Sequence, residues 1–129
     1  MNAIDTNVVV RYLTGDHPTQ SAKARALIEG APAFVATTVM LECEWVLRSA
    51  YGYARVDVAH ALRAFAGLPN VTMAQASVIA AALDLFESGM DFADALHLRL
   101  SAECERFVTF DAKFVKTARR AGPPEVGAA

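Results

Sequence analysis

Short apolar segments separated by longer helical segments constrain the fold of this chain more than any other feature of its sequence. Strand-like runs occur over residues 2–4, 33–36, 71–73 and 106–110. The segments between them carry apolar residues at helical spacing, as Val58, Leu62 and Phe65 illustrate. Parallel strands need such long crossovers, whereas antiparallel neighbours are joined by short hairpins. The sequence therefore predicts an α/β fold with short, mostly parallel strands covered by helices.

Breaker residues define where the helices begin and end. Helices are predicted over residues 6–13, 19–29, 37–50, 58–65, 79–86 and 92–100. Gly15 and Pro18 separate the first two helices, and Gly89 ends the fifth. The chain has 129 residues, of which 54% are hydrophobic, so we expect a single domain over 1–129 with one core. Because of its two prolines, the tail over about 122–129 is predicted to be frayed.

Composition excludes several classes of protein. No apolar run approaches the roughly 18 residues that a membrane-spanning helix needs, and the start Met1-Asn2-Ala3-Ile4-Asp5 lacks the pattern of a signal peptide. We therefore expect a cytoplasmic protein without a membrane partner. The net charge of −2 argues, at first sight, against a nucleic-acid partner.

Four acidic residues lie in apolar surroundings and are the candidates for chemistry. Asp5 follows the first strand and Asp111 the fourth, whereas Glu42 and Asp94 lie within predicted helices. A buried carboxylate without a partner costs several kcal/mol, and few cations lie near these acids in the sequence. If the acids converge, a divalent cation is the natural counter-charge. A set of carboxylates suits Mg²⁺ or Mn²⁺, and zinc is disfavoured because no Cys/His cluster is present.

Each acid also has an ordinary structural interpretation. Asp5 and Asp111 are compatible with simple helix N-caps, and Asp94 with a first-turn acid that the helix dipole favours. Glu42 is compatible with a solvated pair with Glu44, which itself is expected to be an ordinary helix-surface charge. Asp91, three residues before Asp94, is expected to be a cap or a supporting acid.

Four motifs in order resemble those of the PIN domain, and more narrowly those of the VapC-type toxins of bacterial toxin–antitoxin pairs. These motifs are Ile4-Asp5-Thr6-Asn7-Val8 with Arg11, Leu41-Glu42-Cys43-Glu44-Trp45-Val46-Leu47-Arg48, Asp91-Phe92-Ala93-Asp94-Ala95-Leu96-His97 and Thr109-Phe110-Asp111 with Phe114. The resemblance implies a three-layer α/β/α sandwich around a short-stranded, mostly parallel sheet. It further implies that Asp5, Glu42, Asp94 and Asp111, here called the quartet, surround the metal. Asn7 and Thr109 match positions where this family often places polar supporters of the site.

The function that the resemblance implies is metal-dependent endoribonuclease activity. Hydrolysis of RNA, with tRNA or ribosomal RNA as common targets, would use one or two Mg²⁺ or Mn²⁺ ions and leave a 5′-phosphate. Glu42 either binds a second ion or positions the attacking water, and both alternatives stay open. A cognate antitoxin protein and a homodimer, possibly within a larger toxin–antitoxin assembly, are the implied partners.

Surface residues supply candidates for these contacts. Trp45, Tyr51 and Tyr53 are candidates for the partner surface, with a core position as the alternative for Trp45. Cations near the predicted site are candidates to hold RNA phosphates: Arg11, Lys113 and Lys116. Without the quartet the chain has 12 basic and 10 acidic residues, so its net charge does not exclude RNA.

Three rival functions differ from the toxin in the residues that they require. A metal-dependent phosphoryl-transfer domain would need a second acid beside Asp5, which Asp5-Thr6-Asn7 lacks. A non-catalytic PIN-like binding module would be expected to have lost quartet acids, and all four are present. A PIN nuclease for RNA processing or DNA cleavage, without an antitoxin, stays open as the third.

Overall fold

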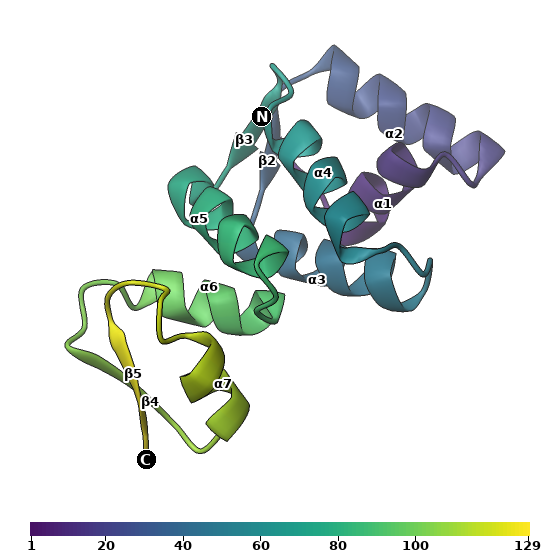
Figure 1. Ribbon diagram of the computed structural model, residues 1–129. Coiled ribbons are helices and arrows are strands. Elements are labelled where there is room, and N and C mark those ends of the chain that lie inside the picture. Colours follow the sequence, from purple (N-terminus) through teal and green to yellow (C-terminus); the bar gives the residue numbers. More distant parts are fainter. The chain divides into compact units, whose positions relative to one another are not determined.

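The computed structural model describes residues 1–129 and divides into two compact units, Met1–Ala76 and Ser77–Ala129. Seven helices and five short strands make up the chain (Figure 1). All strand pairs are parallel. The predicted α/β class with short, parallel strands is therefore confirmed.

The first unit contains a three-stranded sheet in the order β1-β2-β3. Its elements are β1 Asn2–Ala3, α1 Thr6–Thr14, α2 Pro18–Gly30, β2 Ala33–Val35, α3 Thr37–Ser49, α4 Arg55–Ala66 and β3 Val71–Met73. Asn2 pairs with Ala33, and Ala33 pairs in turn with Val71. α1 packs against α2 and α3, and α3 packs against α4 (Figure 1). Within this unit, β1 and β2 each lead directly into a pair of helices.

Local sequence signals set the ends of the first two helices. Asp5 is the N-cap of α1, and Gly15 ends the helix in the left-handed region at φ 63°. Pro18 occupies the first position of α2, where its missing N–H is harmless. His17 caps this helix, because its Nδ1 accepts a hydrogen bond from the Gln20 amide at 3.0 Å. The turn between α1 and α2 is therefore fixed from both sides.

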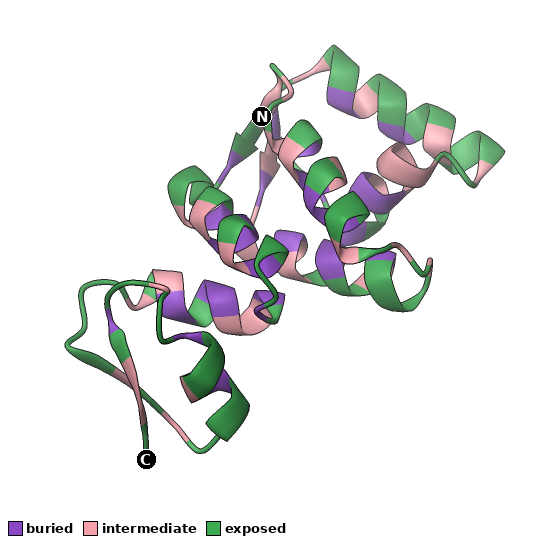
Figure 2. Ribbon diagram, viewed as in Figure 1, coloured by how far each residue is buried: buried purple, intermediate pink, exposed green.

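Apolar side chains from every layer fill the core of the first unit. Fully buried members of this core are Val9, Ile28, Val35, Met40, Leu47, Leu62 and Phe65. Tyr12 packs its ring edge-on against Phe65, with centroids 6.1 Å apart. Figure 2 shows the buried residues of α3 and α4 as stripes along one side of each helix. The periodic residues Val58, Leu62 and Phe65 are thus core residues, as their spacing predicts.

The second unit pairs two strands beside three helices. Its elements are α5 Ala76–Glu87, α6 Phe92–Leu100, β4 Arg106–Thr109, α7 Ala112–Thr117 and β5 Glu125–Ala128. β4 and β5 form a parallel ladder, and α7 contacts both strands. Phe86 and Phe92 meet edge-on at 5.6 Å, which joins α5 to α6.

The prediction of a frayed tail over 122–129 is wrong for Glu125–Ala128, which form β5. Backbone pairing with β4 holds these residues although Gly and Ala favour strands little. The guanidinium of Arg99 also donates hydrogen bonds to the carbonyl oxygens of Ala121 and Pro123, just before the strand. Tertiary contacts therefore order a segment whose own sequence predicts disorder.

Two further outcomes concern elements and membranes. The short helix α7 was not predicted, since six residues are too few for a periodic apolar stripe. The expectation of a single domain over 1–129 stays a prediction. None of the helices is both long and apolar enough to span a membrane.

Candidate active site

Asp5 lies at the junction between β1 and α1. Its carboxylate accepts a hydrogen bond from the Thr6 amide at 2.8 Å, and its side chain is exposed to solvent. Asp5 is thus an N-cap of α1, as its structural interpretation predicts. Because only one amide is bound, the cap leaves carboxylate oxygen available for a cation.

Glu42 is linked to the same junction by the side chain of Thr6. The hydroxyl of Thr6, which is buried, donates to Oε1 of Glu42 at 3.2 Å across from α1 to α3. Burial raises the pKa of the Cys43 thiol to about 12, with smaller contributions from the negative charges of Glu42 and Asp5. Both carboxylates therefore lie within electrostatic reach of one thiol. The first unit brings together two members of the quartet.

Glu44, not Glu42, is the buried acid of α3. Only 2% of Glu44 is exposed, and one carboxylate oxygen accepts a hydrogen bond from Nε of Arg48 at 2.6 Å. The expectation that Glu44 is an ordinary surface charge is wrong. Glu44 shares the buried stripe of Met40, Cys43 and Leu47, whereas Glu42 faces solvent. Glu44, which pairs with Arg48, therefore has a structural role in the packing of α3.

Asp94 lies in the first turn of α6 in the second unit. Desolvation raises the pKa of its carboxyl, and the charges of Asp91 and Asp111 raise it further, while His97 acts in the opposite direction. Asp91 is the N-cap of α6, since its carboxylate accepts from the Asp94 amide at 3.1 Å. Asp91 therefore has the capping role that was one of its two expected roles. The second unit thus concentrates negative charge around Asp94.

Asp111 begins α7 in the same unit. Its Oδ1 accepts a hydrogen bond from the Phe114 amide at 3.1 Å, so the capping interpretation also holds here. Its own amide donates to Oγ1 of Thr109 at 3.0 Å, which fixes the turn between β4 and α7. Thr109 therefore positions the residue that the resemblance assigns to the metal.

The donor chemistry of these residues fits a divalent cation. Asp5 and Glu42 lie in the first unit and Asp94 and Asp111 in the second, and hard cations such as Mg²⁺ and Mn²⁺ prefer oxygen ligands of this kind. The ion pairs of the protein involve other acids: Asp16 with Arg11, Glu29 with Arg25 and Glu44 with Arg48. Neither unit by itself gathers three or more His, Cys, Asp or Glu side chains suited to hold a metal.

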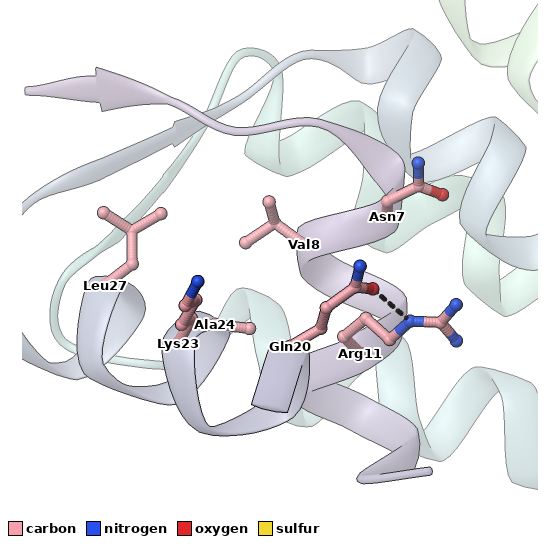
Figure 3. Close-up of a pocket in the computed structure, with 7 residues that line it drawn as sticks. All are labelled: Asn7, Val8, Arg11, Gln20, Lys23, Ala24 and Leu27. Carbon is pink, nitrogen blue, oxygen red and sulfur yellow. Dashed lines mark hydrogen bonds between the residues drawn. The ribbon is translucent and has the colours of Figure 1, made fainter. Parts of the chain in front are cut away.

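Asn7 lies two residues beyond Asp5 and lines a cavity of about 300 Å³ between α1 and α2 (Figure 3). Val8 and Leu27 supply apolar walls, and Lys23 supplies a cation. Figure 3 shows the Arg11 side chain at one end of this cavity, bonded to Gln20. The cavity thus combines apolar walls with amide and cationic groups.

The guanidinium of Arg11 forms an ion pair and hydrogen bonds within the protein. Its Nη1 pairs with Asp16 at 3.1 Å and donates to the hydroxyl of Tyr51 at 2.9 Å. The Tyr51 hydroxyl in turn donates to Asp16 at 2.6 Å. The hydrogen bond from Tyr51, followed by that from Thr14, lowers the pKa of Asp16 to about 2. An RNA phosphate at Arg11 would therefore compete with Asp16.

The candidate partner surface is part exposed and part half-buried. Trp45 is 60% exposed on α3, which excludes the core position that was its alternative. Tyr51 and Tyr53 are half-buried and pack edge-on with centroids 6.3 Å apart. Lys113 and Lys116, the other candidate RNA contacts, are both exposed on α7.

Comparison with protein families decides the affiliation of the chain. The family model described as the PIN domain matches residues 3–120, which span both units. The chain belongs to the PIN domain family. PIN domains are generally metal-dependent nucleases, typically with divalent metals, which agrees with the carboxylates described above. Comparisons with curated proteins and with solved structures gave no match.

Two side chains of this PIN domain were missed in the sequence. The sequence pattern marks Thr6 only as part of a helix entrance, whereas in the structure its hydroxyl also donates a hydrogen bond to Glu42. Phe110 has no predicted role of its own, yet this residue is 94% exposed beside Asp111. An aromatic residue at the end of a strand, directly before a site acid, is the signal that was available for Phe110.

Proposed function

We propose that this PIN domain is a metal-dependent endoribonuclease and acts as the toxin of a toxin–antitoxin pair. Its proposed substrate is RNA, with tRNA or ribosomal RNA as the target classes, and its proposed location is the cytoplasm. The observation that carries the proposal is the family match over residues 3–120, which includes all four quartet acids.

The quartet is the proposed metal-binding set for one or two Mg²⁺ or Mn²⁺ ions. When bound, such an ion orients the phosphodiester, lowers the pKa of bound water and offsets charge that develops on the oxygens. Asp91 and Asp111 disfavour the ionised form of Asp94, and a cation would relieve that repulsion. The Thr6 hydroxyl orients Glu42, which either binds the second ion or positions the water.

The proposed reaction is hydrolysis by in-line attack of water. The water oxygen bonds to phosphorus while the bond from phosphorus to the 3′-oxygen breaks, so the products are a 5′-phosphate and a 3′-hydroxyl. Lys113 and Lys116 are proposed to attract the RNA backbone, because both lie exposed on α7 directly after Asp111. An antitoxin segment over Trp45, Tyr51 and Tyr53, and a homodimer, complete the proposal.

Cleavage of RNA by the purified protein tests the enzymatic part. We expect cleavage with Mg²⁺ or Mn²⁺, loss of cleavage in EDTA, and loss in Asp94→Asn with the fold intact by circular dichroism. Asp57→Asn is the matched control, since Asp57 holds the third position of α4 as Asp94 does of α6. Undiminished cleavage by Asp94→Asn, or equal loss in the control, would sink the assignment.

Induction of the gene in a bacterial host tests the toxin part. Expression of the wild type alone is expected to arrest growth, and expression of Asp94→Asn is expected to be harmless. Sequencing of the RNA ends from arrested cells should show a 5′-phosphate at discrete sites. Harmless induction of an enzyme that cleaves RNA in vitro would instead favour an RNA-processing nuclease without an antitoxin.

A further inference from the structure

Phe110 presents an almost fully exposed aromatic ring at the start of the segment that carries Asp111. The residue lies between β4 and α7, and 94% of its surface is accessible. Trp45, the other exposed large aromatic residue, is 60% exposed. Burial of a phenylalanine side chain is strongly favourable, so an exposed ring beside a site acid is available for a ligand.

The backbone on both sides of Phe110 is held in place. The Asp111 amide donates to Oγ1 of Thr109 at 3.0 Å, and the Phe114 amide donates to Asp111. The carbonyl oxygen of Thr109 accepts a hydrogen bond from the Ala129 amide at 2.8 Å. A ligand that stacks on Phe110 therefore does not have to order this turn, which lowers the entropic cost of binding.

The segment around Phe110 is strongly basic. Residues 106–120 contain one acid, Asp111, and five exposed cations, which are Arg106, Lys113, Lys116, Arg119 and Arg120. Exposed aromatic rings beside cations are the combination by which proteins bind single-stranded nucleic acid, since bases stack on the ring and phosphates pair with the cations. The positive charge of this segment therefore favours an anionic ligand over a purely apolar one.

We propose that Phe110 is a stacking platform for one unpaired base of the RNA substrate and holds that nucleotide beside Asp111. This inference rests on the proposed function and adds to it a side chain that holds the substrate next to the proposed metal ligand. Bases within a duplex already stack on both faces, whereas splayed bases of loops and ends have free faces. Phe110 is thus a positioning residue that acts through base stacking.

Binding of a fluorescein-labelled oligouridine, followed by anisotropy, tests the proposal. All variants are made in the full chain with Asp94→Asn, so that RNA is not cleaved. Phe110→Ala is expected to weaken binding by about 5- to 150-fold, the loss of one base–aromatic stack. Phe110→Trp is expected to retain affinity. Val108→Ala, which trims a 54% exposed apolar residue on the preceding strand β4, is the matched control and should change affinity less than twofold.

Two further readouts separate stacking from a structural role. Lys113→Ala should reduce the salt dependence of binding, whereas Phe110→Ala should lower affinity with the salt dependence unchanged. The wild type contains one tryptophan, Trp45. Against that reference, the added tryptophan of Phe110→Trp should emit as an exposed indole and be quenched by oligouridine, with little quenching by duplex RNA.

Several results would overturn the inference. These are unchanged affinity in Phe110→Ala, equal losses for single-stranded and duplex RNA, no quenching in Phe110→Trp, or an effect on oligomeric state alone. If the wild type cleaves RNA and Phe110→Ala binds and cleaves equally well, the stacking role fails while the nuclease stands. If the wild type neither binds nor cleaves RNA, the proposed function fails and the inference fails with it.

Discussion

Substitution of Asp111 by asparagine and by alanine should separate the capping role of this residue from its proposed role at the metal. Both changes remove the charge, but asparagine keeps an oxygen that accepts from the Phe114 amide, now at 3.1 Å from Oδ1. Asparagine and aspartate are equally good N-caps. Both variants should therefore lose cleavage, and only alanine should also lose the cap.

The expected magnitudes follow from the contacts of Asp111. Loss of an N-cap costs about 1 kcal/mol, which corresponds to a fall of about 4 °C in Tm for a chain of 129 residues. Asparagine gives up a helix-dipole attraction of about 0.3–1 kcal/mol. It also removes a charge that disfavours ionised Asp94. Because these effects oppose each other, Asp111→Asn should stay within about 0.5 kcal/mol of the wild type.

Thermal unfolding in EDTA and cleavage in Mn²⁺ measure the two roles independently. Asp91 caps α6 with the same geometry, so Asp91→Asn and Asp91→Ala should reproduce the stability difference. Cleavage by both Asp111 variants should fall by more than the roughly 10- to 100-fold that loss of a group orienting a metal ligand costs. Equal destabilisation by asparagine and alanine would refute the capping argument, and wild-type cleavage by Asp111→Asn would refute the metal assignment.

Two more predictions concern polar contacts of the first unit. Arg48→Met leaves the buried carboxylate of Glu44 without its 2.6 Å partner and should cost about 3 kcal/mol in urea denaturation. Glu29→Gln, which breaks the exposed pair with Arg25 and leaves Arg25 over the Tyr12 ring, should cost less than about 0.5 kcal/mol. Tyr51→Phe removes the main cause of the low pKa of Asp16, so that pKa should rise from about 2 toward 3.8 in an NMR titration. The lowered pKa of Asp16 stabilises the native state above pH 3.8, and this contribution is lost as the pH falls to about 2. The variant should therefore lose less stability than the wild type over that pH range. An unchanged titration of Asp16 would contradict the assignment.

The order of elements was predictable because each depends on local pattern. Val58, Leu62 and Phe65 mark one face of α4, and Gly15 and Gly89 mark helix ends through positive φ angles. Glu44 was also within reach of sequence reasoning, since it shares the helical stripe of Met40 and Leu47. The expectation of a surface position is wrong because the ion pair with Arg48 allows Glu44 to be buried.

Other features depend on contacts that the sequence does not display. β5 exists because β4 supplies a ladder and Arg99 binds the carbonyl groups before it. The link from Thr6 to Glu42 joins residues 36 positions apart, a distance that no local pattern encodes. The sequence predicts the four quartet acids as metal ligands. The structure adds the contacts that hold three of them: Asp5 and Asp111 cap helices, and Glu42 accepts a hydrogen bond from Thr6.

The double use of Asp5 and Asp111 as helix caps and proposed metal ligands has a genetic consequence. Every aspartate codon becomes an asparagine codon by one base change, and asparagine preserves the cap. A chain that arrests growth can therefore be silenced in one mutational step without losing its fold. Among cells that survive induction, full-length suppressors should include asparagine at positions 5 and 111. These suppressor proteins should accumulate normally.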